Sequence, residues 1–154
     1  MSGTAPASTG RTGQGFGRLL VAVYGVLALA AVGRSAYQVA TKLEHAPVAY
    51  LLSLLAALVY VVATVALARG GRGPHWRAVA WCAVVVEACG VLVVGALSLL
   101  EPGWFHEATV WSGFGQGYGY VPLVLPFVGL WWLWHTRPRG DVPATTPARP
   151  TEAR

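Results

Sequence analysis

Two long stretches of this chain contain almost no charge, and they limit what it can fold into more than any other feature. Residues 46–68 carry no charged side chain, and residues 78–100 carry only Glu87. Each stretch has 23 residues, and about 20 apolar residues are enough for a helix to cross a bilayer. A small soluble domain does not contain helices that are apolar on every face. Only 11% of the residues are charged, against roughly 25% in soluble proteins, so the sequence predicts an integral membrane protein.

The apolar segments and the prolines predict an all-α fold, a polytopic membrane protein built as a bundle of four transmembrane helices. The expected spans lie near residues 19–39, 46–68, 77–100 and 120–135, within one membrane domain at 18–135. Pro47 suits the first turn of the second helix, and Pro102 follows the end of the third. Residues 1–17 and 136–154 have no periodic apolar pattern, so both are predicted to be disordered cytoplasmic tails.

The first span has an alternative interpretation as a cleaved signal peptide. Arg18 precedes a short apolar core, and Ala28-Leu29-Ala30 has the small residues of a cleavage site. The segment continues in helix-compatible residues to about Val39, which favours a retained helix. Cleavage would leave three spans, with the same orientation for the rest of the chain.

Positive charge is concentrated in the two tails and in the loop between the second and third spans: Arg11, Arg18, Arg69, Arg72, Arg77, Arg137 and Arg139. The first loop has Lys42, and the third has no Lys or Arg. By the positive-inside rule both termini face the cytoplasm, an N-in/C-in topology. The use of Arg, Ala, Val and Gly is typical of a GC-rich bacterial genome, so we expect a multi-pass protein of the bacterial cell (plasma) membrane. Anionic lipids of the inner leaflet account for the net charge of +5, and no nucleic-acid partner is expected.

The segment "WSGFGQGYGY" has a glycine at every second position from Gly113 to Gly119 and falls in the third loop. A helix with this many glycines is unfavourable by about 1 kcal/mol for each one relative to alanine, so an extended or turning path is expected. In an extended path one side is bare glycine, and the other carries aromatic rings suited to the headgroup interface. We expect a close-packed re-entrant or capping loop, with ligand recognition as the alternative. The candidate extracytoplasmic loop residues are Trp111, Gly113, Gly115, Gln116, Gly117 and Gly119.

Two ionisable residues lie inside the predicted spans. Glu87 is ten residues beyond Arg77, or about 15 Å into the membrane. Arg34 is sixteen residues beyond Arg18, or about 24 Å from the cytoplasmic side. Charged groups in a membrane usually pair, so Arg34 and Glu87 form a candidate intramembrane polar pair, with Tyr60 as a hydrogen-bond donor at comparable depth. In the alternative, Glu87 is protonated and joins helices by a structural hydrogen bond.

No residue pattern indicates a catalytic centre, so we expect that the protein is not an enzyme and has no cofactor and no metal. A C-x-x-C pair is absent, and no Ser/His/Asp or Cys/His arrangement is recognisable. His45, His106 and Glu107 fall in the two outer loops and remain a weak alternative as a metal site, because histidines in different loops have no fixed spacing.

The run "GRSAYQVATKLEHAPVAYLLSLLAALVYVVATVAL", the third span with its glutamate, and "VWSGFGQGYGYVPLVLPFVGLWWL" together cover most of residues 18–134. In these segments the chain resembles small four-span integral membrane proteins of actinobacteria, a group without an assigned activity. The portion from Phe114 to Pro126 is the most distinctive. The resemblance implies the four-span topology and implies nothing about mechanism.

Two functions from different classes are consistent with these features. The first is a non-enzymatic accessory or scaffold subunit, in which small residues let the helices pack on another membrane protein or on a second copy: Gly25, Gly33, Gly90 and Gly95. The second is an oligomeric small transporter or channel component that uses Glu87 as its coupling group.

Overall fold

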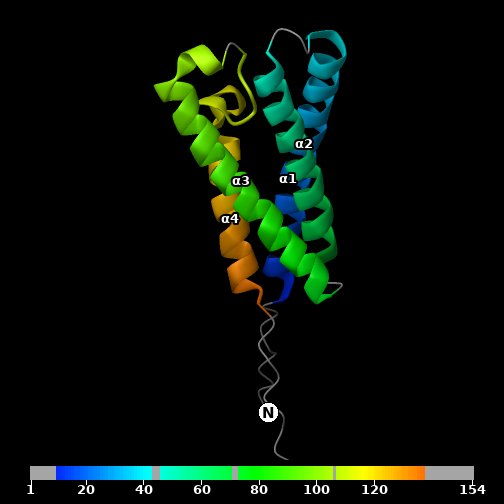
Figure 1. Ribbon diagram of the computed structural model, residues 1–154. Helices are drawn as coiled ribbons and strands as arrows, with labels where there is room; N and C mark the ends of the chain where they lie inside the picture. Colours follow the sequence, from blue (N-terminus) through cyan, green and yellow to red (C-terminus); the bar gives the residue numbers. More distant parts are fainter. Residues whose placement is uncertain (1–9, 43–45, 71–72, 106, 138–154) are drawn as a thin grey trace, which may run out of the picture.

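The computed structural model describes residues 10–42, 46–70, 73–105 and 107–137, and all regular structure within these ranges is helical (Figure 1). The long helices are α1 (Gly10–Lys42), α2 (Pro47–Arg69) and α3 (Pro74–Leu100). Two short 3-10 helices follow, η2 (Pro102–Trp104) and η3 (Ser112–Tyr118), and then α4 (Val121–His135). The predicted all-α fold is therefore confirmed.

Three of these helices are long and apolar enough to cross a membrane: residues Gly15–Thr41 of α1, all of α2 and all of α3. The α4 helix is also apolar, but its 15 residues give a length of only about 22 Å. The expected helices at 46–68 and 77–100 agree with α2 and α3 to within three residues, because prolines stand in the first turn of each.

The start of α1 corrects the sequence-based expectation. The helix begins at Gly10, so residues 10–17 are helical and do not form the predicted disordered tail. It then runs without a break past Ala30 to Lys42. Residues 1–9 and 138–154, which make up the rest of the predicted tails, lie outside the described residues.

The outer faces of the helices are covered with large apolar side chains. Examples from α1, α2, α3 and α4 are Leu29, Leu51, Val93 and Val124, all of them well exposed. Because exposed apolar surface of this extent is unfavourable in water, these helices indicate contact with a lipid bilayer.

The bundle consists of two parts that meet between α2 and α3. In the first part α1 packs along α2, where alanines on α2 are almost fully buried and allow a close approach: Ala56, Ala57, Ala63 and Ala66. In the second part α3 packs against α4 and η3. The start of α1, the end of α2, the start of α3 and the end of α4 lie at one end of the bundle, and residues 101–105 and 107–120 lie at the other (Figure 1).

Candidate functional site

Glu87 on α3 is a carboxyl group in the middle of a long apolar helix, and it is fully buried. Tyr24 of α1 is buried as well, and its hydroxyl donates a hydrogen bond of 2.7 Å to Oε2 of Glu87. Over the described residues α1 and α3 do not pack backbone against backbone. The Tyr24–Glu87 hydrogen bond therefore joins the two parts of the bundle.

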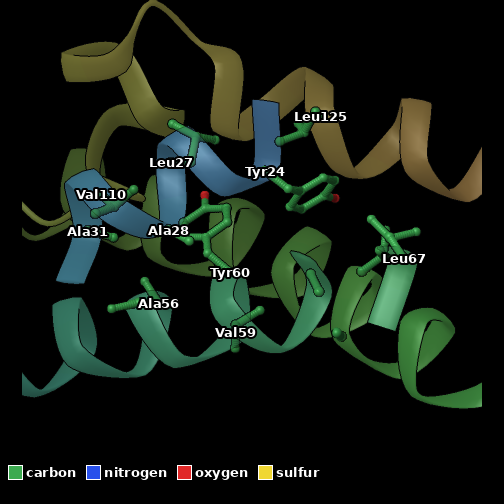
Figure 2. Packing of buried hydrophobic residues seen from close by; sticks show 14 of the residues in the cluster. Tyr24, Leu27, Ala28, Ala31, Ala56, Val59, Tyr60, Leu67, Val110 and Leu125 are labelled. Atoms are coloured by element: carbon green, nitrogen blue, oxygen red, sulfur yellow. The ribbon is translucent and has the colours of Figure 1, made fainter. Parts of the chain in front are cut away.

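Two further polar groups lie beside this carboxyl. Tyr60 of α2 is buried, its ring centroid lies 6.3 Å from that of Tyr24, and its hydroxyl faces both Glu87 and the indole of Trp111. Figure 2 shows Tyr24 and Tyr60 in the packed layer between the helices. We call Tyr24, Tyr60, Glu87 and Trp111 the polar cluster.

Three atoms of the polar cluster have no hydrogen-bond partner within the described part of the chain: Oε1 of Glu87, the hydroxyl of Tyr60 and Nε1 of Trp111. A carboxylate oxygen accepts hydrogen bonds, whereas a phenol and an indole N–H donate them. The three groups are therefore chemically complementary, although only the Tyr24–Glu87 hydrogen bond is formed.

The structure does not bring Arg34 to Glu87, so the candidate pair is not formed. The Arg34 guanidinium instead donates a hydrogen bond of 2.6 Å to the carbonyl oxygen of Ala108. Arg34 lies ten residues beyond Tyr24 on α1, or about 15 Å along the helix axis. Because Tyr24 already stands at the level of Glu87, Arg34 is left near the loop that precedes η3.

Of the two paths that the alternate glycines allow, extended or turning, the segment takes the turning one. It folds into 3-10 turns over Ser112–Tyr118, and the backbone is left-handed at Gly113, Phe114 and Gly115 and again at Gly119 and Tyr120. The amide of Gly119 donates to the carbonyl oxygen of Gln116, and that of Tyr120 donates to the carbonyl oxygen of Gly115. Glycine adopts positive φ without steric cost, so three of the five left-handed positions are glycines. The expectation that α4 does not extend back to Trp111 is confirmed.

Two aromatic side chains of this segment, Trp111 and Phe114, pack against α3. A Cβ atom on Gly90 would lie 2.7 Å from the ring of Trp111, and one on Gly95 would lie 2.5 Å from the ring of Phe114. Gly90 and Gly95 therefore receive the rings of this loop, which corrects the expectation that they contact other helices. Trp111 is buried, at 2% exposure, so its ring packs inside the protein. Gln116, Gly117 and Gly119 remain exposed.

A hydroxyl network fixes the base of the same loop. Ser98 on α3 accepts a hydrogen bond of 2.8 Å from the amide of Gly113 and donates one of 2.9 Å to the carbonyl oxygen of Gly95. Thr109 accepts hydrogen bonds from the amides of Trp111 and Ser112. Hydrogen bonds on both sides of Trp111 thus determine its position in the polar cluster.

Tyr24 is the site residue that the sequence analysis missed. The signal was present, because Tyr24 stands alone as a hydrogen-bonding side chain in the apolar run from Leu19 to Gly33. The rule that charges in a membrane pair with one another favours Arg34 instead. A tyrosine hydroxyl can satisfy a buried carboxyl without bringing a second charge into the membrane.

The outer-loop metal site falls largely outside the structure. His45 and His106 are not among the described residues, and the residues that are described contain no group of three or more His, Cys, Asp or Glu side chains arranged to hold a metal ion. Comparison of the chain with protein-family models, with curated proteins and with solved structures finds no match.

Proposed function

We propose that the protein is a four-span, N-in/C-in membrane protein of the bacterial plasma membrane that acts as a non-enzymatic accessory or scaffold subunit. The observation that carries this proposal is the buried hydrogen bond between Glu87 and Tyr24. The Glu87 carboxyl is enclosed and hydrogen-bonded to Tyr24, so it connects α1 to α3 within the chain. A buried polar group used in this way stabilises one packing of the helices.

The fourth span is supported by the packing at both ends of α4. The helix is apolar and packs against α3. The η3 helix lies against the first turn of α4, where a Cβ atom on Gly115 would be 2.8 Å from Pro122. A helix of about 22 Å together with a loop folded over its start is long enough to reach across most of a 30 Å hydrocarbon core. Irregular backbone at that depth is acceptable because protein surrounds it.

A scaffold subunit must present a surface to its partner, and photo-crosslinking in native membranes tests this. A crosslinking amino acid at Val124, in the apolar groove between α3 and α4, is expected to give one discrete protein adduct. The same group at Leu29, which is 77% exposed on α1, serves as the control for collisions in the membrane. The adduct should persist in Glu87→Gln, because an amide retains the hydrogen-bond acceptor that Tyr24 needs. Lipid adducts alone at both positions would contradict the scaffold function.

The second candidate is an oligomeric transporter or channel component with Glu87 as its coupling group. The observation that favours it is the set of unpartnered buried atoms around the Glu87 carboxyl. Purified protein in liposomes with a pH gradient tests it. Proton-dependent flux that Glu87→Gln abolishes, with unchanged folding, would support coupling, because an amide cannot exchange a proton. Absence of flux from the wild-type protein would favour the scaffold.

A further inference from the structure

A cavity of about 680 Å³ opens where the end of α2, the start of α3 and the end of α4 meet. Arg77, Trp81, Trp132 and Thr136 line it, together with Gly73 at the start of α3. Gly73 provides no side-chain cap for α3, so the unpaired amides of the first helical turn add partial positive charge to this side of the cavity. Polar donors and large aromatic rings thus surround one space.

Within the described part of the chain, the positive charge at the cavity is not balanced by a carboxylate. The Arg77 guanidinium donates hydrogen bonds to the carbonyl oxygen of Leu133 and to the hydroxyl of Thr136, and both of these acceptors are uncharged. The Arg137 guanidinium lies at the same cavity, because it is 5.7 Å from the ring of Trp81, which lines the cavity beside Arg77. Among the described residues the nearest carboxyl group along α3 is Glu87, ten residues or about 15 Å from Arg77. An anion between the two guanidinium groups would remove their repulsion.

Aromatic rings hold the second arginine at this position. The Arg137 guanidinium lies 3.8 Å from the ring centroid of Trp134 and 5.7 Å from that of Trp81. Arg69 is placed in the same way, 4.8 Å over the ring of Trp76. Tryptophan and arginine together are typical of the level of the lipid headgroups in a membrane protein.

An apolar groove of about 410 Å³ continues from this cavity along the seam between α2 and α3. Ala78 lines both spaces, and the groove extends along α3 past Cys82 to Val86. Eight residues of helix correspond to about 12 Å, measured from the headgroup level toward the middle of the bilayer. The opposite wall consists of apolar side chains of α2, including Leu58 and Val62.

We propose that these two spaces form one binding site for an anionic phospholipid, with its phosphate between Arg77 and Arg137 and one acyl chain in the α2–α3 groove. The proposal rests on the membrane location proposed above and not on the scaffold role. A phosphate group matches the paired guanidinium groups, and a continuous apolar groove matches a chain that a soluble phosphate compound lacks. Basic pockets between helices on the cytoplasmic side are suited to lipid headgroups.

Native mass spectrometry of the full chain in mild detergent tests the proposal, with phosphatidylglycerol, phosphatidylcholine and free glycerol phosphate as probes. We expect the wild-type protein to bind phosphatidylglycerol at least about fivefold more strongly than phosphatidylcholine. Arg137→Gln should lower the affinity for phosphatidylglycerol about fivefold, since one arginine near a headgroup contributes to binding to that extent. Arg77 is left unchanged because it also holds the end of α4. Arg18→Gln, an exposed arginine on α1 that does not line the cavity, is the matched control and should bind as the wild type does.

The groove is tested separately by Cys82→Phe, which narrows it, with Val85→Phe as the control on the face of α3 outside the groove. Only Cys82→Phe should weaken the binding of phosphatidylglycerol. Equal retention of the two lipids, or binding of glycerol phosphate as strong as that of phosphatidylglycerol, would overturn the lipid site. Lipid binding is measured in detergent without a partner protein, so it tests the lipid site alone. The crosslinked adduct at Val124 tests the scaffold function, and either result can fail without the other.

Discussion

Tyr24 and Glu87 show how a single hydrogen bond acts when both of its partners are removed from water. Each side chain is fully buried, so breaking their 2.7 Å hydrogen bond leaves a donor or an acceptor with no solvent to replace it. A buried carboxyl without a hydrogen-bond partner costs more free energy than a buried phenol without one, because a carboxylate charge is unfavourable to bury. Stability should therefore depend on this pair more than on any exposed tyrosine.

We predict that Tyr24→Phe lowers the free energy of unfolding by about 1–3 kcal/mol, because it leaves Oε2 of Glu87 without its donor. Tyr37→Phe is the control, since Tyr37 lies on the same helix and is 62% exposed. Glu87→Gln should cost less than Tyr24→Phe, because the amide still accepts a hydrogen bond. Unfolding in detergent, followed by the far-ultraviolet circular dichroism of the helices, measures all three. Equal effects of the two tyrosine changes would show that the hydrogen bond contributes nothing.

At the scale of elements, α3 is organised around the loop that follows it. Gly90 and Gly95 lie five residues apart on α3 and take the rings of Trp111 and Phe114. The loop is thereby held against the helix, and Trp111 is brought beside the other residues of the polar cluster. The left-handed turns of the loop allow the chain to reverse in a short distance before α4 begins at Val121.

Gly90→Ala is predicted to destabilise the protein by about 1–3 kcal/mol, because the added methyl group overlaps the Trp111 ring at 2.7 Å. Gly33→Ala on α1, where nothing lies within 4 Å, should instead be neutral or stabilising by up to about 1 kcal/mol. Thermal unfolding in detergent gives both values. A neutral Gly90→Ala would mean that the indole does not pack against α3.

A second pair of glycines tests the loop backbone. Gly115 has φ of 79°, and a Cβ atom there would lie 2.8 Å from Pro122, whereas Gly117 has negative φ and open space around it. We expect Gly115→Ala to destabilise the protein by about 1–3 kcal/mol, because strain and overlap act together. Gly117→Ala should change stability by less than about 0.5 kcal/mol. Proteolysis of the outer loop, measured on intact cells, should increase only for Gly115→Ala.

At the scale of the whole molecule, two groups of helices are connected mainly through α2 and α3, and two hydrogen bonds add connections from α1. Tyr24 reaches Glu87 in the interior, and Arg34 reaches the carbonyl oxygen of Ala108 at the end opposite Arg77. Among the described residues, Arg69 ends α2, Arg77 lies in the first turn of α3 and Arg137 follows α4, so three arginines lie at one end of the bundle. This distribution supports the orientation in which that end is cytoplasmic.

Cysteine accessibility tests the orientation. Single cysteines at positions 72 and 107, in a chain whose exposed Cys82 and Cys89 are replaced by alanine, should react differently with an impermeant thiol reagent on intact cells. Only position 107 should be labelled from outside, because the positive-inside rule places the arginine-rich end in the cytoplasm. Labelling of position 72 alone would indicate the opposite orientation, with both termini outside the cytoplasm.

The sequence by itself determined the helical class and the bounds of α2 and α3, since the length of an apolar run and the place of a proline are local properties of the chain. Charge-free residues 46–68 can satisfy their backbone in lipid only as a helix. The break before α4 was equally local, because alternate glycines and Pro122 both oppose a continuous helix. The early start of α1 at Gly10 could not be predicted from local sequence, since the glycines and polar residues there give no helical pattern.

Only the tertiary structure decided which groups meet. Depth along separate helices predicted Arg34 as the partner of Glu87, with Tyr60 as an added hydrogen-bond donor, whereas the packing of α1 placed Tyr24 at the carboxyl and Arg34 at Ala108. The inward turn of Trp111 likewise depends on the space that Gly90 leaves on a different element. Such contacts depend on how neighbouring helices are rotated and tilted, and no local pattern of residues contains that information.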